Sequence, residues 1–167
     1  MAALMLFCAL LLAASAAHKA AARERLATAT ARLAGTGALG GQLLLIVAGT
    51  AEIVAALCLL IEPLRLAGAV IAAALWGGYA IALARRHGET LDCGCDLAAR
   101  AKPVTWALVL RSAALALLAG GLGIMPDAPL TPEAPFAAAG LLALYLAASE
   151  LLAIPSPQWR TPHRKAA

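Results

Sequence analysis

The sequence predicts an all-α protein, a polytopic membrane helix bundle with four or five transmembrane helices that form a single domain over residues 1–167. Hydrophobic residues make up 63% of the chain and charged residues only 13%, whereas soluble domains carry about 25% charged residues. The apolar residues lie in separate stretches whose lengths approach the ~20 residues that a helix needs to cross a bilayer. The short connections between them leave no room for a separate soluble domain.

The first apolar stretch, residues 2–17, can be interpreted in two ways. At 16 residues it is short for a span, and Ala14-Ser15-Ala16 has the small residues of a signal-peptidase site. A secretory signal also begins with basic residues, however, and this stretch has no Lys or Arg before Lys19. We therefore expect a retained first helix, in which Cys8 is a small buried apolar residue.

His18 and Lys19 follow this stretch, and we expect both at the membrane edge. Residues 20–33 are basic and amphipathic, which predicts a short helix on the membrane surface, where Arg and Lys stems can lie along apolar groups. His18 is either a ligand or proton carrier near the cysteines described below, or simply a solvated side chain.

The second predicted span, residues 38–61, carries a carboxylate at Glu52. A carboxylate inside a bilayer is costly and usually faces the bundle interior, so Glu52 is either a hydrogen-bonded structural group or a proton or cation site. Gly37 and Gly41 have the small-xxx-small spacing that lets a neighbouring helix approach closely. Cys58, near the far end, is expected to pack between helices.

Three further spans are predicted at residues 66–84, 104–125 and 136–154. The last two carry Arg111 and Glu150, seven and four residues from their helix ends, so at ~1.5 Å per residue the two side chains lie at similar depths. This predicts an ion pair between Arg111 and Glu150, with Glu52 deeper in the bundle.

The basic residues predict the orientation of the bundle. Eleven of the 13 Lys and Arg residues lie on one side, after the first span, around the cysteines and in the C-terminal tail, and the opposite side has only Arg65. By the positive-inside rule that basic side faces the cytoplasm, and five spans place the N-terminus outside. The basic residues have no aromatic residues interleaved, so the net charge of +4 indicates topology and no nucleic-acid partner.

The longest polar connection in the second half, residues 85–103, is here called the cysteine loop, and its centre is Asp92-Cys93-Gly94-Cys95-Asp96. A disulfide needs Cα atoms ~4.4 to 6.8 Å apart, so Cys93 and Cys95 can bridge only across a sharp turn, which Gly94 permits. Such a small ring is strained, and strained disulfides are easily reduced. The pattern predicts a thiol-disulfide site.

Two other interpretations of the loop stay open. Cys93 and Cys95, with His87 or His18, could hold Cu(I) or Zn, although the spacing supplies no fourth ligand. The loop could also dock a partner in a purely structural subunit. Asp92 and Asp96 disfavour thiolates while the nearby Arg and Lys residues favour them, so the sequence does not decide whether either cysteine is activated. No metal site and no cofactor are predicted.

The sequence resembles the MauE family of membrane proteins, which are related to DoxX-like bundles. The matching features cover roughly residues 1–120: His18-Lys19 after a first apolar helix, Ala51-Glu52-Ile53 inside the second, Leu91-Asp92-Cys93-Gly94-Cys95 in the loop and Ala107-Leu108-Val109-Leu110-Arg111 in the next helix. The Asp-Cys-Gly-Cys core is the most specific of them.

The resemblance implies an accessory protein of methylamine utilisation in the bacterial cytoplasmic membrane, which helps to process or mature the small subunit of periplasmic methylamine dehydrogenase. Cys93 and Cys95 would be its redox pair, and a thioredoxin-like protein its partner. Asp92, Gly94, Glu52, Arg111, His18 and Lys19 carry over as supporting positions. A periplasmic substrate conflicts with the cytoplasmic orientation that the basic residues predict, unless reducing equivalents are relayed across the membrane.

Overall fold

The computed structural model describes residues 1–91, 102–126 and 131–151. The elements are α1 (Ala2–Ala21), α2 (Arg23–Ala34), α3 (Ala38–Leu60), the 3-10 turn η1 (Glu62–Leu64), α4 (Arg65–Arg85), β1 (Thr90–Leu91), β2 (Lys102–Pro103), α5 (Trp106–Ile124) and α6 (Ala134–Leu151). Five segments are long and apolar enough to cross a membrane, namely α1, α3, η1 with α4, α5 and α6. The prediction of an all-α membrane bundle is therefore confirmed, and the single short strand pair in the described residues joins the ends of the cysteine loop.

The helix ends agree with the predicted spans except at the first. The apolar stretch predicted to end at residue 17 continues as helix through Ala21, so His18 and Lys19 lie in the last turn of α1 and the prediction that they follow the helix is wrong. The cause is local, since the segment is rich in alanine, the best helix former, and contains no Gly or Pro to stop it. The last predicted span reaches residue 154, and its final residues lie outside the described part of the chain.

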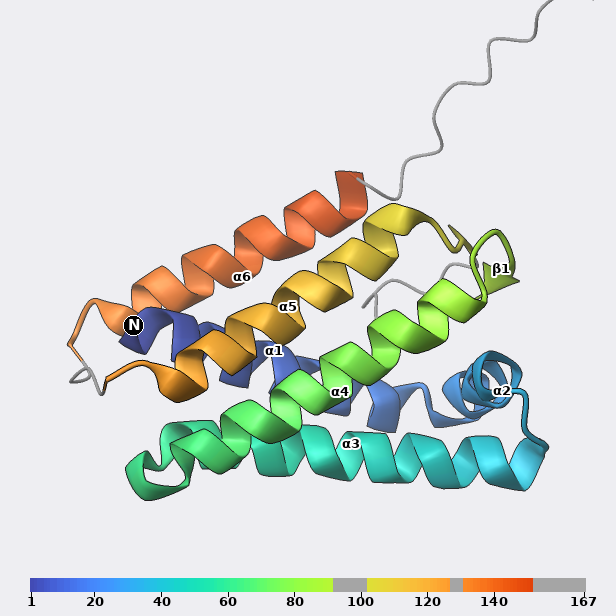
Figure 1. Cartoon of the computed structure of the whole chain (residues 1–167), viewed down its shortest axis with the longest axis horizontal. Coiled ribbons are helices and arrows are strands. Elements are labelled where there is room, and N and C mark those ends of the chain that lie inside the picture. Colours follow the sequence, from blue (N-terminus) through green and yellow to red (C-terminus); the bar gives the residue numbers. More distant parts are fainter. Residues whose placement is uncertain (92–101, 127–130, 152–167) are drawn as a thin grey trace, which may run out of the picture.

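Helix α2 confirms the predicted amphipathic connector and lies across one end of the bundle (Figure 1). Its C-cap is Gly35, whose φ of 68° is a left-handed conformation that residues with a Cβ rarely adopt. Leu26 and Ala31 are its buried residues. A Cβ on Gly41 of α3 would lie 2.5 Å from the Ala27 carbonyl oxygen, so the predicted close approach is confirmed at Gly41, with α2 as the neighbour, whereas a Cβ on Gly37 would meet no atom within 4 Å.

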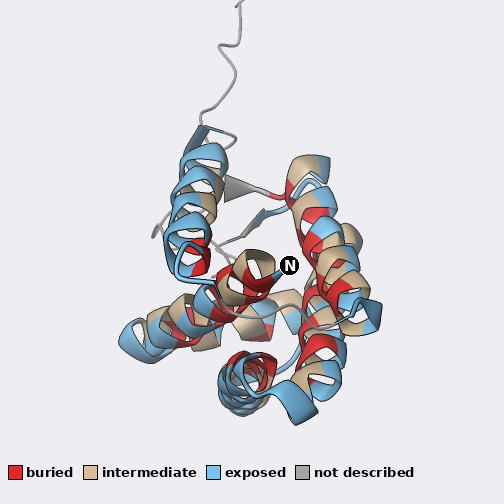
Figure 2. Cartoon of the chain, turned by 90° about the vertical axis from the view of Figure 1, so that its left-hand side faces the viewer, coloured by how far each residue is buried: buried red, intermediate tan, exposed pale blue. Residues whose placement is uncertain are grey.

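Helix α1 occupies the centre of the bundle and α6 its edge. In an apolar stretch of 18 residues, half of the residues of α1 are buried, whereas in the corresponding stretch of α6 only 11% are buried. Figure 2 shows the buried residues turned toward the interior. Cys8 is fully buried in this core, as predicted, while Cys58 is half-buried. Near the end of α3, Gly68 lets α4 approach closely, since a Cβ added to Gly68 would lie 2.7 Å from the Leu59 amide nitrogen.

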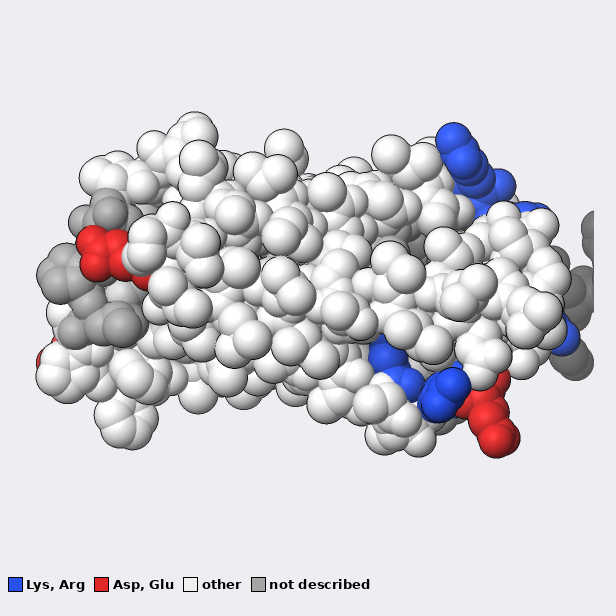
Figure 3. All heavy atoms as spheres, turned by 90° about the horizontal axis from the view of Figure 1, so that it is seen from below, with Lys and Arg blue, Asp and Glu red and all other residues white. Residues whose placement is uncertain are grey.

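Basic side chains gather toward one end of the bundle. On the face seen in Figure 3, the Lys and Arg side chains lie toward that end with an acidic side chain beside them, and the opposite end carries acidic side chains. The basic end is the end with α2 and the strand pair (Figure 1). The arrangement agrees with the basic asymmetry of the sequence, and which side of the membrane this end faces stays a prediction.

Candidate functional site

A buried polar cluster joins α1, α3 and α4. The Lys19 Nζ atom lies 2.7 Å from Oε1 and 3.0 Å from Oε2 of Glu52, and it donates a further hydrogen bond of 2.7 Å to the Ser15 hydroxyl. Glu52 Oε1 also accepts hydrogen bonds from the Ser15 and Tyr79 hydroxyls, each of 3.0 Å. The three protons of the ammonium group thus have three acceptor oxygens within reach.

The helices bring this cluster together by simple geometry. Ser15 and Lys19 are four residues apart on α1, so they lie on the same helix face. Glu52 comes from the interior of α3 and Tyr79 from the interior of α4. Glu52 is 0% exposed and Lys19 8% exposed, so the two charges are removed from solvent and neutralise each other.

The structure confirms one prediction for this region and adds a pairing that the sequence did not indicate. Glu52 faces the bundle interior and is paired, as expected for an intramembrane carboxylate. Lys19 is the partner of Glu52, which the sequence did not indicate, and its place at the membrane edge stays a prediction. Ser15 and Tyr79 were not recognised as members of the site. The signal in the sequence is the spacing of four residues between Ser15 and Lys19, which puts both on one face of a helix that continues past residue 17.

Arg111 lines a small cavity that Ser15 and Tyr79 of the polar cluster also line. Its guanidinium carbon is 5.7 Å from the centre of the Tyr145 ring. The cavity has a volume of about 30 Å³, the share of one water molecule in the liquid. Its lining comes from four helices: Leu11, Ser15, Trp76, Tyr79, Arg111, Ser112, Leu115 and Tyr145. Glu150 is exposed on the last turn of α6, and the ion pair expected between it and Arg111 stays a prediction.

His18 lies away from the polar cluster, at the corner between α1 and α2. It is half-buried, and its Nε2 atom is 3.3 Å from a terminal nitrogen of Arg25. This contact ties the end of α1 to α2, which in turn contacts β1. His18 thus contacts the helix that reaches the base of the cysteine loop, and its supporting role stays a prediction.

Asp92, Cys93, Gly94 and Cys95 lie outside the described residues, but both ends of the cysteine loop are described. Thr90 pairs with Pro103 and Leu91 with Lys102 in the antiparallel β1–β2 pair. The Gly88 N–H donates to the Val104 carbonyl and the Val104 N–H to the Glu89 carbonyl, both at 2.9 Å. The two ends of the segment that carries the cysteines are thereby fixed next to each other.

Side chains at the base of the loop have partners of their own. The His87 ring lies 4.8 Å from the Trp106 ring, and Arg86 forms an ion pair of 3.3 Å with Glu89. No group of three or more His, Cys, Asp and Glu side chains that could hold a metal ion occurs in residues 1–91, 102–126 and 131–151. The metal site considered from the sequence stays a prediction, because its cysteines lie outside the described residues.

Comparison with known proteins agrees with the resemblance seen in the motifs. The family model described as methylamine utilisation protein MauE matches residues 1–126, a range that includes the polar cluster and the cysteine loop. The methylamine utilization protein MauE of Paracoccus denitrificans is 40% identical over 122 residues, which cover 68% of this chain and 66% of that protein, slightly under two thirds of its length. No solved structure matches the chain. The chain is therefore a multi-pass membrane protein that belongs to the MauE family.

Proposed function

We propose that this protein is an accessory factor of methylamine utilisation in the bacterial cytoplasmic membrane. It helps to mature the small subunit of periplasmic methylamine dehydrogenase by thiol-disulfide exchange at Cys93 and Cys95. Membership of the MauE family supports the pathway, and the Asp92-Cys93-Gly94-Cys95 motif supports the chemistry.

The observation that carries the proposal is the closed base of the cysteine loop. The β1–β2 pair leaves ten residues, 92–101, between Leu91 and Lys102. A redox pair that meets a macromolecular partner must be reachable by that partner, and the strand pair fixes both ends of the segment that carries Cys93 and Cys95. The core cysteine Cys8, fully buried and surrounded by apolar residues, has no such access.

The exchange balances as two thiol-disulfide steps. A thiolate of the small subunit attacks one sulfur of the Cys93–Cys95 disulfide, a mixed disulfide forms and the other sulfur leaves as a thiolate. The second thiolate of the subunit then resolves the mixed disulfide, so the subunit gains a disulfide and the pair gains two electrons and two protons. The disulfide of a thioredoxin-like partner reoxidises the pair by the same steps in reverse order.

In this proposal, the buried polar cluster of Lys19, Glu52 and Tyr79 holds the helices that position the cysteine loop. The contacts of Lys19 with Glu52 and of Glu52 with Tyr79 hold α1, α3 and α4 in one arrangement. His18 and Arg25 then connect α1 to α2, and α2 contacts β1 at the loop base. In this proposal Glu52 and Lys19 are positioning residues, and the chemistry belongs to the cysteines.

Serine substitutions test the proposal. Cys93→Ser and Cys95→Ser should each abolish maturation of the dehydrogenase small subunit, measured as its disulfide content, while the amount of inserted protein stays unchanged. The matched control is Cys58→Ser, which changes a half-buried cysteine on α3 and should leave maturation intact. In purified protein, the loop should accept two maleimide labels only after reduction.

Three results would contradict the proposal. Normal maturation in both loop variants would exclude a role for the pair. About one soft metal ion per chain, with labelling that rises on chelation without reductant, would show a metal site instead. Normal maturation together with loss of a partner from pull-downs would indicate a structural docking subunit.

Orientation is tested separately. The basic residues predict that a membrane-impermeant thiol reagent leaves Cys93 and Cys95 unlabelled in spheroplasts and reaches them after lysis. That result would require electrons to be relayed across the membrane from the periplasmic subunit to the cytoplasmic pair. Labelling in intact spheroplasts would overturn the predicted orientation and place the pair directly on the periplasmic side.

A further inference from the structure

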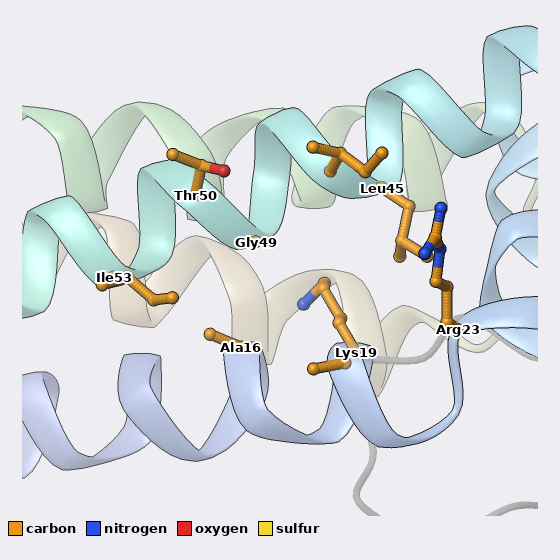
Figure 4. A pocket seen from close by; sticks show the side chains of 9 residues that line it. Ala16, Lys19, Arg23, Leu45, Gly49, Thr50 and Ile53 are labelled. Carbon is orange, nitrogen blue, oxygen red and sulfur yellow. The ribbon is translucent and has the colours of Figure 1, made fainter.

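A pocket opens between α1 and α3 beside Lys19, and neither the family comparison nor the proposed function accounts for it. It has a volume of about 280 Å³, close to the lower limit of about 300 Å³ that is usual for ligand sites. Its lining residues are Ala16, Lys19, Ala20, Arg23, Leu45, Ile46, Gly49, Thr50 and Ile53. Figure 4 shows Lys19 and Arg23 pointing into the space between the two helices.

The pocket exists because small residues face each other across the two helices. Ala16 and Ala20 on α1 lie opposite Gly49 on α3, and a Cβ added to Gly49 would meet no atom within 4 Å. Most of the lining is apolar, and Ile46 and Ile53 beside it are about half exposed on the outer face of α3. In a bilayer this face contacts lipid, so the pocket is open to acyl chains.

The charge of the pocket is concentrated at Arg23. Lys19 is neutralised by Glu52, and its ammonium group already has three acceptors. Arg23 is exposed at the start of α2 and has no ion-pair partner among the residues that the structure describes, while its neighbour Glu24 does not line the pocket. An apolar pocket with one positive charge at its headgroup end complements a lipid with one negative charge.

We propose that this pocket binds a monoanionic phospholipid, with its phosphate on Arg23 and the upper part of one acyl chain between Ala16 and Gly49. The guanidinium group can bind two phosphate oxygens at once. Along α3 the pocket runs from Leu45 to Ile53, about 12 Å at 1.5 Å per residue, so it accommodates the upper part of a chain while the remainder stays in the bilayer. The site is independent of the cysteine chemistry.

Native mass spectrometry of the full-length protein in detergent tests the headgroup contact. Phosphatidylglycerol should occupy the first lipid site about tenfold more tightly than phosphatidylcholine with the same chains. Arg23→Gln should remove this preference. Arg32→Gln, which changes an exposed arginine on the same helix outside the pocket, should retain it.

Filling the pocket tests the acyl-chain contact. Gly49→Leu places an apolar side chain in the open space and should weaken the first phosphatidylglycerol site about tenfold. Gly140→Leu on α6 is the matched control, because that helical glycine also has no atom within 4 Å of an added Cβ and lies outside the pocket. The melting temperatures of both variants should stay near that of the wild type.

Several outcomes would overturn the proposal. Equal affinity for the two lipids in the wild type would exclude headgroup recognition, and equal losses in Arg23→Gln and Arg32→Gln would indicate diffuse surface charge. An unchanged first site in Gly49→Leu would exclude the pocket. Displacement of the lipid by inorganic phosphate at matched ionic strength would indicate a soluble anion. Cys93→Ser should bind lipid like the wild type, so failure of the maturation proposal leaves this test intact.

Discussion

The ion pair between Lys19 and Glu52 joins two helices inside the bundle, whereas the pair between Arg86 and Glu89 lies within one turn at the base of the cysteine loop. The side chains of the first pair are 9% and 1% exposed, and those of the second are 33% and 48% exposed. Desolvation makes a buried charge costly when its partner is removed, while water and salt screen an exposed pair. The same chemistry can therefore hold helices together at one site and contribute little at the other.

The largest expected effect is at the buried pair. Lys19→Met or Glu52→Leu alone should lower the free energy of unfolding by about 3 to 5 kcal/mol, because each leaves an unpaired buried charge. The double variant should recover much of this loss, since two apolar side chains need no partner. Unfolding in mixed micelles and the amount of inserted protein measure the effect. Equal losses in the single and double variants would contradict a paired arrangement.

Tyr79→Phe should have a smaller effect. It removes the 3.0 Å hydrogen bond to Glu52 but keeps the ring, whose centre is 5.4 Å from the Lys19 ammonium nitrogen. Interhelical hydrogen bonds in membrane proteins contribute about 0.6 kcal/mol on average and at most about 1.7 kcal/mol, so we expect a loss near the average in the same unfolding assay. In the Lys19→Met/Glu52→Leu background the substitution should cost less, and an undiminished loss there would show that Tyr79 acts elsewhere.

For Arg111 and Glu150 we expect an effect on the free energy of unfolding between those of the buried and the exposed ion pairs. If they pair as the sequence predicts, a cycle of Arg111→Leu, Glu150→Leu and the double variant should give a coupling free energy of up to about 1 kcal/mol, because Glu150 is exposed. Additive losses would show that the two are not partners.

The smallest effect is expected at the loop base. Glu89→Gln removes the exposed pair with Arg86 but leaves the Glu89 carbonyl that accepts the Val104 N–H. The free energy of unfolding should change by less than about 0.5 kcal/mol, and the difference from the wild type should shrink further as salt is added. A loss as large as that of Glu52→Leu would refute the contrast between the two pairs.

Local features were sufficient to predict the helices. Each apolar stretch is bounded by charged residues, Gly or Pro, and the basic connector after the first stretch has the pattern of a surface helix. Gly41 showed where another helix comes close. One boundary, at residue 17, was misplaced. The apolar stretch stops before His18, but the alanine-rich helix continues through Ala21.

The sequence by itself determined the fold class, the spans, the basic end and the two cysteines one residue apart. Only the tertiary structure decided that Lys19 pairs with Glu52, 33 residues away, that Tyr79 joins them, and that Gly49 borders an open pocket while Gly68 is closely packed. The physical reason is that these membrane helices are apolar on nearly every face, so their sequences do not indicate which face meets which neighbour. That choice depends on the packing of small residues and on polar partners that lie far apart in the chain.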